Sequence, residues 1–271
     1  MPFIKKFRTD FFLENKQIQL SNDYLKTARL KKITGTRLGS VLGKDAYKSP
    51  LKAWAIMTGI YEEVIDPIFA TAGKVLEKKL LSHVNEKMGI NYHNYDPYQY
   101  GWDLFADNKY FGGIPDAEAS NAPMLEIKTT SIDDFALVYD KQIRGFLVKK
   151  DDNGIPIVKN PKGKYKKWFI DNKVVIPINY KMQLGLYLYL RNQLEGMFII
   201  CFLQKEDYAY PEKCDVKKRE IIFEKMKINL NLFRKYLLTA EEWYEKHVLT
   251  GVSPQMTDEE INWLLKEVDQ L

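Results

Sequence analysis

The segment from Phe111 to Thr129 constrains the fold of this chain more than any other feature. It reads FGGIPD, then a polar stretch rich in turn-forming residues, then MLEIKT. Two extended runs separated by turn formers are typical of a β-hairpin. Because side chains alternate between the two faces of a strand, Glu126 and Lys128 share one face. The sequence therefore predicts a carboxylate and an ammonium side by side on one strand.

A second carboxylate, Asp116, ends the first run of this hairpin. If Gly113 to Asp116 pairs antiparallel with the following strand, Asp116 approaches Glu126. Mg²⁺ is commonly held by one or two carboxylates, waters and a substrate phosphate, and Asp116, Glu126 and the Ile127 carbonyl suit it. Lys128 would position or help deprotonate an attacking water. The pattern favours phosphodiester hydrolysis, although these residues alone also fit a solvated surface hairpin.

Length and composition predict a single domain over residues 1–271. The chain is 45% hydrophobic and 13% aromatic, which is ample for a packed core. No long apolar run follows the N-terminal lysines, and the longest apolar stretch, Met197 to Leu203, has the length of a strand. We expect no membrane span and no export signal, and hence a cytoplasmic protein, in the host cytoplasm if a phage encodes it.

The cysteines and histidines exclude the common soft-metal sites. Cys201 and Cys214 form no CxxC pair, and the three histidines form no HExxH set. Cys201 lies in the apolar run and is expected to be a small buried side chain. The chain also lacks a GxxxxGK[ST] phosphate loop, so ATP hydrolysis has no support.

Positive charge is concentrated in two segments. Residues 1–50 carry 11 Lys/Arg against 4 Asp/Glu, and residues 141–181 carry 11 against 3. The net charge of +5 thus combines two basic segments with an acidic remainder. This arrangement suits a polyanion, although a lysine-rich segment such as 141–181 can equally be solvated surface.

Hydrophobic periodicity and capping residues predict the order of elements. Helices are expected at 23–32, from Ile33 onward, from Ser49 to Gly59, and at 68–88, 179–192, 225–249 and after Thr257. Strands are expected at 102–106, 109–116, 196–204 and 219–223. The polar stretch 151–163 predicts a long loop or projecting hairpin. This order predicts an α/β fold with a mixed central β-sheet flanked by α-helices.

Five segments together resemble the PD-(D/E)xK nuclease superfamily, and specifically the lambda-type phage exonucleases with the YqaJ-like viral recombinases. They occur in the expected order between about residues 25 and 205: Arg29 to Thr36, Gly73 to Glu77, Pro115-Asp116, Glu126-Ile127-Lys128 and Tyr180-Lys181-Met182-Gln183. The resemblance implies the restriction-endonuclease-like core as the fold.

The resemblance also implies roles for the central residues. Asp116, Glu126 and the Ile127 carbonyl would bind the metal, Mg²⁺ with Mn²⁺ as a substitute, and Lys128 would be the catalytic lysine. Glu77 would complete the site, through a metal-bound water or a second ion. Without the resemblance, Glu77 reads as an exposed helix carboxylate.

Three further residues gain a role from the resemblance. Gln183 resembles the glutamine that orients the nucleophilic water, and Arg29 and Thr36 resemble the pair that receives the 5′-phosphate of a DNA end. A guanidinium fork and a hydroxyl are suitable phosphate ligands. Taken alone, Gln183 is a polar position on an amphipathic helix, and Arg29 is one cation among many.

The sequence departs from the family pattern in three places. Ala117 stands where glycine often follows the aspartate, so the turn there is expected to differ. Thr36 replaces the more usual serine and keeps the hydroxyl. The basic segment 141–176 looks like an inserted loop or hairpin, which would grip DNA, contact a partner subunit, or do neither.

The resemblance implies a Mg²⁺-dependent exodeoxyribonuclease that degrades the 5′-ended strand of double-stranded DNA and leaves 3′ overhangs for phage-type recombination. It further implies a homotrimer and a single-strand annealing recombinase as partner. Two alternatives stay open: a structure- or sequence-specific endonuclease on the same core, and a DNA-binding module without catalysis.

Overall fold

A three-stranded mixed sheet lies at the centre of the computed structural model, which describes residues 11–63, 65–143 and 145–268. The strand order is β13–β12–β5. β5 (Met124–Ser131) runs parallel to β12 (Glu195–Leu203), whereas β13 (Ile221–Lys227) runs antiparallel to β12. β12 is the middle strand and is buried on both faces, which explains why its sequence is almost continuously apolar.

Two long helices lie against this sheet. α4 (Pro67–Met88) begins where the Asp66 side chain accepts a hydrogen bond from the Ile68 N–H, and it ends at Gly89, which has a φ of 64°. The left-handed backbone there favours glycine. α6 (Ile178–Leu190) follows the basic segment. Both helices were predicted within two residues of these bounds.

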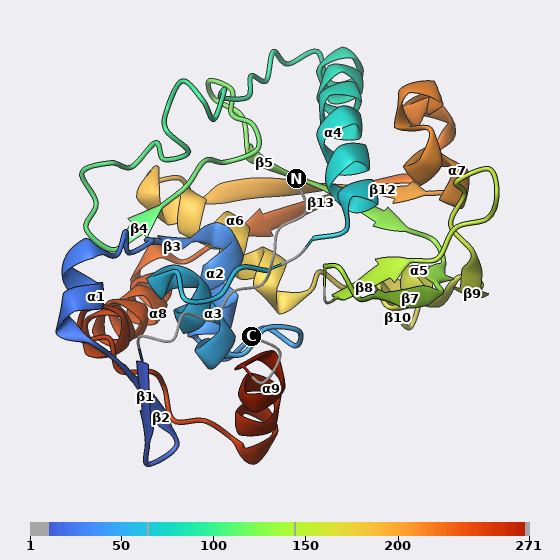
Figure 1. Ribbon diagram of the computed structural model, residues 1–271. Coiled ribbons are helices and arrows are strands. Elements are labelled where there is room, and N and C mark those ends of the chain that lie inside the picture. The colour runs from blue at the N-terminus through green and yellow to red at the C-terminus, as the bar shows by residue number, and fades with distance from the viewer. Residues whose placement is uncertain (1–10, 64, 144, 269–271) are drawn as a thin grey trace.

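The two helices cover opposite faces of the sheet, as Figure 1 shows. Leu125 and Ile127 of β5 belong to the core cluster that contains the buried side chains of α4. Met124 belongs instead to the cluster that contains Leu184 and Leu188 of α6. Because strand side chains alternate, Glu126 and Lys128 must project on the α6 side. The fold thus directs both charged groups of the motif into one layer.

The N-terminal elements surround a separate core. They are β1 (Phe11–Glu14), β2 (Gln17–Leu20), α1 (Asn22–Thr27), β3 (Ile33–Thr34), α2 (Gly35–Val41) and α3 (Pro50–Thr58). The Trp54 side chain of α3 is fully buried, and its Nε1 donates to the His247 carbonyl at 2.9 Å. This hydrogen bond joins the N-terminal helices to the C-terminal ones.

The segment between β5 and α6 consists of short strands and one short helix. They are β6 (Asp134–Phe135), β7 (Leu137–Asp140), β8 (Gly145–Val148), β9 (Val158–Asn160), α5 (Gly163–Lys166), β10 (Phe169–Ile170) and β11 (Lys173–Val174). β7 pairs with β8, β6 with β9 and β10 with β11, all antiparallel. The Asp66 carboxylate accepts a hydrogen bond from the Val148 N–H at 2.7 Å, which fastens these hairpins to α4.

The C-terminal part packs in two places. The short helices α7 (Lys205–Ala209), η1 (Pro211–Lys213) and η2 (Val216–Lys218) lie against α4. The N-terminal core is closed by α8 (Leu230–Trp243), the π-helical turn η3 (Tyr244–Leu249) and α9 (Asp258–Val268). Thr257 and Glu260 form the predicted capping box: the Glu260 N–H donates to the Thr257 hydroxyl, and the Thr257 N–H donates to the Glu260 carboxylate. Within the described residues, no helix is long and apolar enough to cross a membrane.

The predicted fold class is confirmed, but several elements differ from the expectation. Residues 102–106 form turns and only Phe111–Gly112 (β4) is a strand, parallel to β3. The helix expected at 23–32 ends at Thr27, and the helix expected from residue 225 begins at Leu230 because β13 extends to Lys227.

Candidate active site

Glu126 and Lys128 form a close ion pair on β5. The Lys128 Nζ lies 2.5 Å from Glu126 Oε1, and the side chains are 18% and 0% exposed. Neither oxygen of Glu126 has a hydrogen bond of good geometry from the described residues, although Lys128 and Asp116 both lie within reach of this carboxylate. A buried carboxylate whose oxygens lack hydrogen bonds is unfavourable without a further cationic partner.

Asp116 lies beside the edge of β5, as the hairpin interpretation predicted. Its Oδ2 accepts a hydrogen bond from the Ile127 N–H at 2.7 Å. The pairing between the two segments is a single antiparallel bridge, Ala117 to Leu125, rather than a ladder. Because the N–H and C=O of one strand residue point to the same side, the Ile127 carbonyl also faces Asp116.

Glu77 approaches the same place from α4. It interacts electrostatically with Asp116 and Lys128 although α4 lies on the opposite face of the sheet. β5 is the edge strand of the three-stranded sheet, and Asp116 lies next to that edge. Glu77 therefore meets the other carboxylates at the edge of the sheet rather than through it.

Burial, together with the negative charge of Asp116, raises the pKa values of Glu126 and Glu77. Burial, and then the Asp116 carboxylate, raise the pKa of Glu126 to about 8 against the opposing effect of Lys128. Burial and the Asp116 carboxylate likewise raise the pKa of Glu77 to about 7. Three acidic groups beside one ammonium leave an excess of negative charge when all are ionised, and a divalent cation would balance it.

These residues fit a divalent metal ion of the hard type. Among the described residues, no set of three His, Cys, Asp or Glu side chains has the arrangement of a complete metal site. Mg²⁺, however, uses one or two carboxylates and completes its shell with waters and substrate oxygens. Asp116 and Glu126, with the Ile127 carbonyl beside them, supply such oxygens, and the oxygens of Glu126 lack hydrogen bonds.

Lys128 is held as a cation. Burial tends to lower the pKa of Lys128, but the Glu126 and Asp116 carboxylates outweigh it and raise that pKa. The ammonium also lies 5.1 Å from the centre of the Tyr180 ring, a favourable cation–π position. A protonated lysine can position a water or stabilise a negative charge, but it cannot accept a proton.

Gln183 is buried in α6 on the side of the sheet toward which Lys128 projects. It lines a cavity of about 300 Å³ with Thr36 and Tyr180. A Cβ on Gly35 would lie 2.7 Å from Gln183 Cγ and 3.0 Å from the Tyr187 ring, so the glycine is needed for α2 to lie this close to α6. The structure thus brings Gln183 and Thr36 to one cavity wall beside Tyr180.

Arg29 and Thr36, the predicted phosphate pair, line different cavities. Arg29 is exposed and lines a cavity with Thr34 and Arg37, whereas Thr36 lies in the cavity of Gln183. The two threonine hydroxyls are 3.1 Å apart, so Thr34 lies between the two positions. Arg37 was not predicted from the sequence, where it is one basic residue in a basic segment.

Tyr187 is a second residue that the sequence did not single out. Burial, followed by the Glu126 and Asp116 carboxylates, raises the pKa of its phenol. A Cβ on Gly113 would lie 2.6 Å from the Tyr187 hydroxyl. Tyr187 is one helical turn beyond Gln183, which places both on one face of α6; that spacing was the only available signal.

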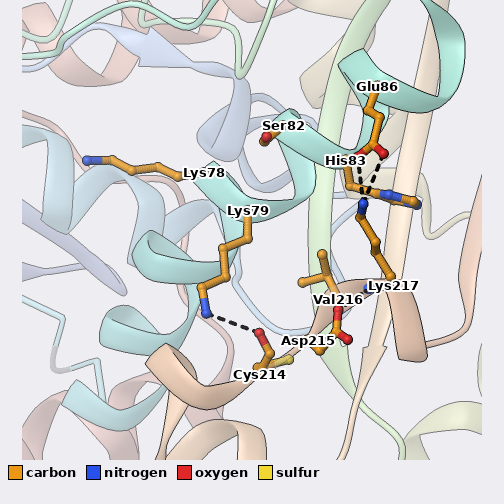
Figure 2. Close-up of a pocket in the computed structure, with 9 residues that line it drawn as sticks. All are labelled: Lys78, Lys79, Ser82, His83, Glu86, Cys214, Asp215, Val216 and Lys217. Carbon is orange, nitrogen blue, oxygen red and sulfur yellow. Dashed lines mark hydrogen bonds and ion pairs between the residues drawn. The ribbon is translucent and has the colours of Figure 1, made fainter.

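Figure 2 shows a different cavity, between α4 and the short helices before β13. Two of its lysines already have partners: Lys217 lies 2.7 Å from Glu86 Oε2, and Lys79 donates to the Cys214 carbonyl at 3.0 Å. None of the predicted site residues lines it. The contacts fasten α4 to the segment before β13, which is a structural role.

Comparison with known proteins gives two kinds of similarity in sequence. Residues 23–145 match the model of the YqaJ-like viral recombinase domain, a range that holds every predicted site residue except Gln183. The chain is also 45% identical over 277 residues to the uncharacterized protein MG373 of Mycoplasma genitalium, covering 97% of this chain and 98% of that protein. The MG373 homolog of Mycoplasma pneumoniae is 44% identical, with the same coverage.

Two solved structures resemble the chain at low identity. An alkaline exonuclease from Laribacter hongkongensis matches with a TM-score of 0.49 and 13% identity, over 92% of this chain and 99% of that one. A phage related exonuclease from Haemophilus somnus matches with a TM-score of 0.46 and 12% identity, over 80% and 95%. Likeness at this level assigns no role to any residue of this chain.

Proposed function

The chain belongs to the family of the MG373 proteins and carries a YqaJ-like viral recombinase domain, and from this premise we propose that it is a metal-dependent exodeoxyribonuclease. The reaction is hydrolysis of a phosphodiester bond at the end of double-stranded DNA. One observation carries the proposal: Glu77, Asp116 and Glu126 converge from α4, the edge segment and β5 around one lysine.

Asp116, Glu126 and the Ile127 carbonyl would hold the metal, which we take to be Mg²⁺ with Mn²⁺ as a substitute. When bound, such an ion neutralises charge on a phosphodiester and lowers the pKa of water. Hard oxygen donors support this choice over zinc. Glu77 lies next to Asp116 and, with a pKa of about 7, can hold or release a proton close to neutral pH.

Lys128 and Gln183 are assigned to the attacking water and the developing charge. The ammonium of Lys128 stays protonated, so it donates hydrogen bonds and stabilises negative charge as it grows on the phosphate oxygens. Gln183, held in α6, orients the water with its amide. An oriented donor of this kind typically contributes about 10²- to 10³-fold to the rate.

The choice of DNA end rests on basic groups near the site. Arg29 and Thr36 are proposed to contact the 5′-phosphate, so that the 5′-ended strand is degraded and 3′ overhangs remain for recombination. The exposed positions of both residues leave them accessible to DNA. Thr34 lines the cavity of Arg29, and its hydroxyl lies 3.1 Å from that of Thr36.

We further propose the setting that the family resemblance implied. The protein acts in the cytoplasm, as a homotrimer, with a single-strand annealing recombinase as partner. Residues 1–271 act as one exonuclease domain, and the hairpins of segment 141–176 form an insertion in it. Size-exclusion chromatography with light scattering tests the oligomeric state.

Digestion of a linear duplex tests the function. Each strand end is labelled separately, with or without a 5′-phosphate, in Mg²⁺ and in EDTA. We expect Mg²⁺-dependent release from the phosphorylated 5′ end, and loss of release in Asp116→Ala and Lys128→Ala. Lys235→Ala, which removes an exposed cation in α8 outside the two basic segments, is the matched control and should digest like the wild type.

A covalently closed circle, digested in parallel, separates the alternatives. An exonuclease leaves the circle intact, so cleavage of the circle would favour a structure- or sequence-specific endonuclease. If Asp116→Ala and Lys128→Ala bind DNA as the wild type does, and Mg²⁺-dependent release does not distinguish them from it, a binding module without catalysis is favoured. Equal digestion of phosphorylated and unphosphorylated ends would contradict the assignment of Arg29 and Thr36.

A further inference from the structure

A basic cavity with an aromatic wall lies beside the candidate active site. It has a volume of about 460 Å³. Its wall contains four cations, a hydroxyl and an indole: Arg29, Lys31, Lys32, Arg37, Thr34 and Trp102. Gly112 and Gly113 also line it. Gly113 is three residues before Asp116, so the two Cα atoms are at most about 11 Å apart. The cavity and the carboxylate cluster can therefore contact the same end of a DNA strand.

The cations of this cavity are only partly neutralised. Lys32 pairs with Asp103 at 2.8 Å. Arg37 donates one hydrogen bond to the Lys32 carbonyl at 2.9 Å, and within the described part of the chain it has no carboxylate partner. Burial lowers the pKa of Lys31, the like charge of Arg37 lowers it further, and the Glu62 carboxylate offsets part of this effect. Neighbouring cations that are only partly compensated are typical of a site for an anion.

Trp102 contributes an aromatic side chain to the wall of this cavity. The side chain is 62% exposed, which is unusual for an indole that could have been buried. Its φ is 68°, a left-handed conformation that is rare for a bulky residue and stores strain. The Tyr98 ring lies 5.5 Å away in an edge arrangement, so it supports the indole from one side.

The loop that carries Trp102 is fixed by hydrogen bonds rather than free. The Trp102 N–H donates to the Pro97 carbonyl at 2.8 Å. The Asp103 carboxylate accepts from the Phe105 N–H at 2.9 Å and from the Gly113 N–H at 3.0 Å. These contacts hold the strained residue in place and tie it to the segment that leads to Asp116.

We propose that Trp102 stacks on the base of the terminal nucleotide of the 5′-ended strand, while Arg29 and Arg37 hold its phosphate. The inference rests on the proposed nuclease function and adds to it a base contact and a second arginine. Charge complementarity favours a nucleotide over an uncharged apolar partner, because the indole shares its cavity with Arg29 and Arg37, which have no carboxylate partner among the described residues. Stacking on an indole is tolerant of sequence, as an enzyme that degrades any DNA end requires.

Binding to two duplexes in EDTA tests the proposal without cleavage. Both carry a 5′-phosphate, and they differ only in whether the first nucleotide of that strand has an adenine base or is abasic. Trp102→Ala should bind the adenine duplex about 5- to 150-fold more weakly than the wild type, the usual range for one stacked base. It should bind the abasic duplex as well as the wild type does.

Two further variants guard against a trivial result. Trp102→Phe keeps an aromatic face and should restore most of the discrimination between the duplexes. Leu232→Ala removes a side chain of α8 that is 54% exposed and does not line the cavity, and it should bind both duplexes like the wild type. Equal weakening of Trp102→Ala on both duplexes would overturn the proposal, as would a wild type that binds them equally.

The nuclease proposal is judged separately on the same DNA. Lys128→Ala is assayed for cleavage in Mg²⁺ and for binding in EDTA. If Lys128→Ala still cleaves, the proposed function fails while the base discrimination can still be read from binding. If Lys128→Ala is inactive but Trp102→Ala binds the two duplexes with unchanged discrimination, only the stacking proposal fails.

Discussion

The affinity of the protein for a divalent metal should fall steeply as the pH is lowered from 8 to 6. A metal ion needs ionised carboxylates, whereas the raised pKa values, about 8 for Glu126 and about 7 for Glu77, mean that both groups hold protons over this range. Competition by the Glu126 proton alone lowers the apparent affinity about 50-fold, and displacement of the Glu77 proton as well gives about 500-fold.

The free Mn²⁺ signal in electron paramagnetic resonance measures this affinity without DNA. The affinity of the wild type should fall more than that of Glu77→Gln, because Glu77 must ionise when the metal binds. Glu77→Gln removes one of the two competing protons and should reduce the fall to about 50-fold. Glu126→Gln should bind weakly already at pH 8, because it removes a ligand. A wild-type affinity that does not change with pH would show that protons do not compete with the metal. An equal fall in Glu77→Gln would show that the Glu77 proton does not compete with it.

The same pKa shift has a consequence for the metal-free protein. Since the folded state raises the pKa of Glu126 from 4.5 to about 8, folding favours the protonated carboxyl. The contribution of this group to stability is greatest at low pH and declines as the pH rises through that window. Added metal should therefore raise the melting temperature more at pH 8 than at pH 6, by linkage to the ionised form.

Three other predictions follow from the geometry. Gly113→Ala should destabilise the fold by about 1–3 kcal/mol, because its Cβ would lie 2.6 Å from the Tyr187 hydroxyl at a φ of 120°. Urea denaturation measures the free energy of unfolding, and a loss below a few tenths of a kcal/mol would contradict this prediction. Arg219→Ala removes the two guanidinium hydrogen bonds of 2.6 and 2.7 Å to Asp207, which is 3% exposed and keeps the Gln204 N–H at 2.9 Å as its backbone donor among the described residues. About 3–5 kcal/mol should therefore be lost, and a near-neutral result in the same denaturation assay would show that water replaces the guanidinium. DNA binding in EDTA should weaken with salt, log K falling by about 0.9 per neutralised phosphate for each tenfold rise in salt, and an affinity independent of salt would exclude binding through phosphates.

The long periodic elements were predictable because local and tertiary preferences agree in them. α4 has Pro67 in its first turn and Gly89 at its end, and β12 is apolar throughout because both its faces are buried. The start of the last helix was predictable for the same reason, because the Thr257 and Glu260 side chains accept hydrogen bonds from each other's backbone N–H groups within one turn.

The segment between α4 and β5 was harder to predict because side chains there replace the backbone ladder. The aromatic residues of 102–116 suggest strands, but the Asp103 carboxylate accepts from two backbone N–H groups. The Asn108 amide likewise accepts from the Tyr110 and Phe111 N–H groups. Such local hydrogen bonds turn the chain away from an extended course, and nothing in the periodicity reveals them.

The residues of the candidate site also differ in how far local sequence predicts them. Asp116, Glu126 and Lys128 could be proposed from sequence because one hairpin holds all three and strand alternation fixes their faces. Arg37 and Tyr187 could not, since their roles depend on how α2 packs against α6. That packing requires Gly35, because an added Cβ there would clash with Gln183. A single glycine in the sequence does not indicate which residue it packs against.

Anomalous scattering from crystals grown or soaked in Mn²⁺ shows directly whether these carboxylates hold a metal ion. We expect one strong peak bound by the Asp116 and Glu126 carboxylates, next to the Ile127 carbonyl, and no such peak in Asp116→Ala. Carboxylates that stay apart in the presence of Mn²⁺, with no peak between them, would contradict it.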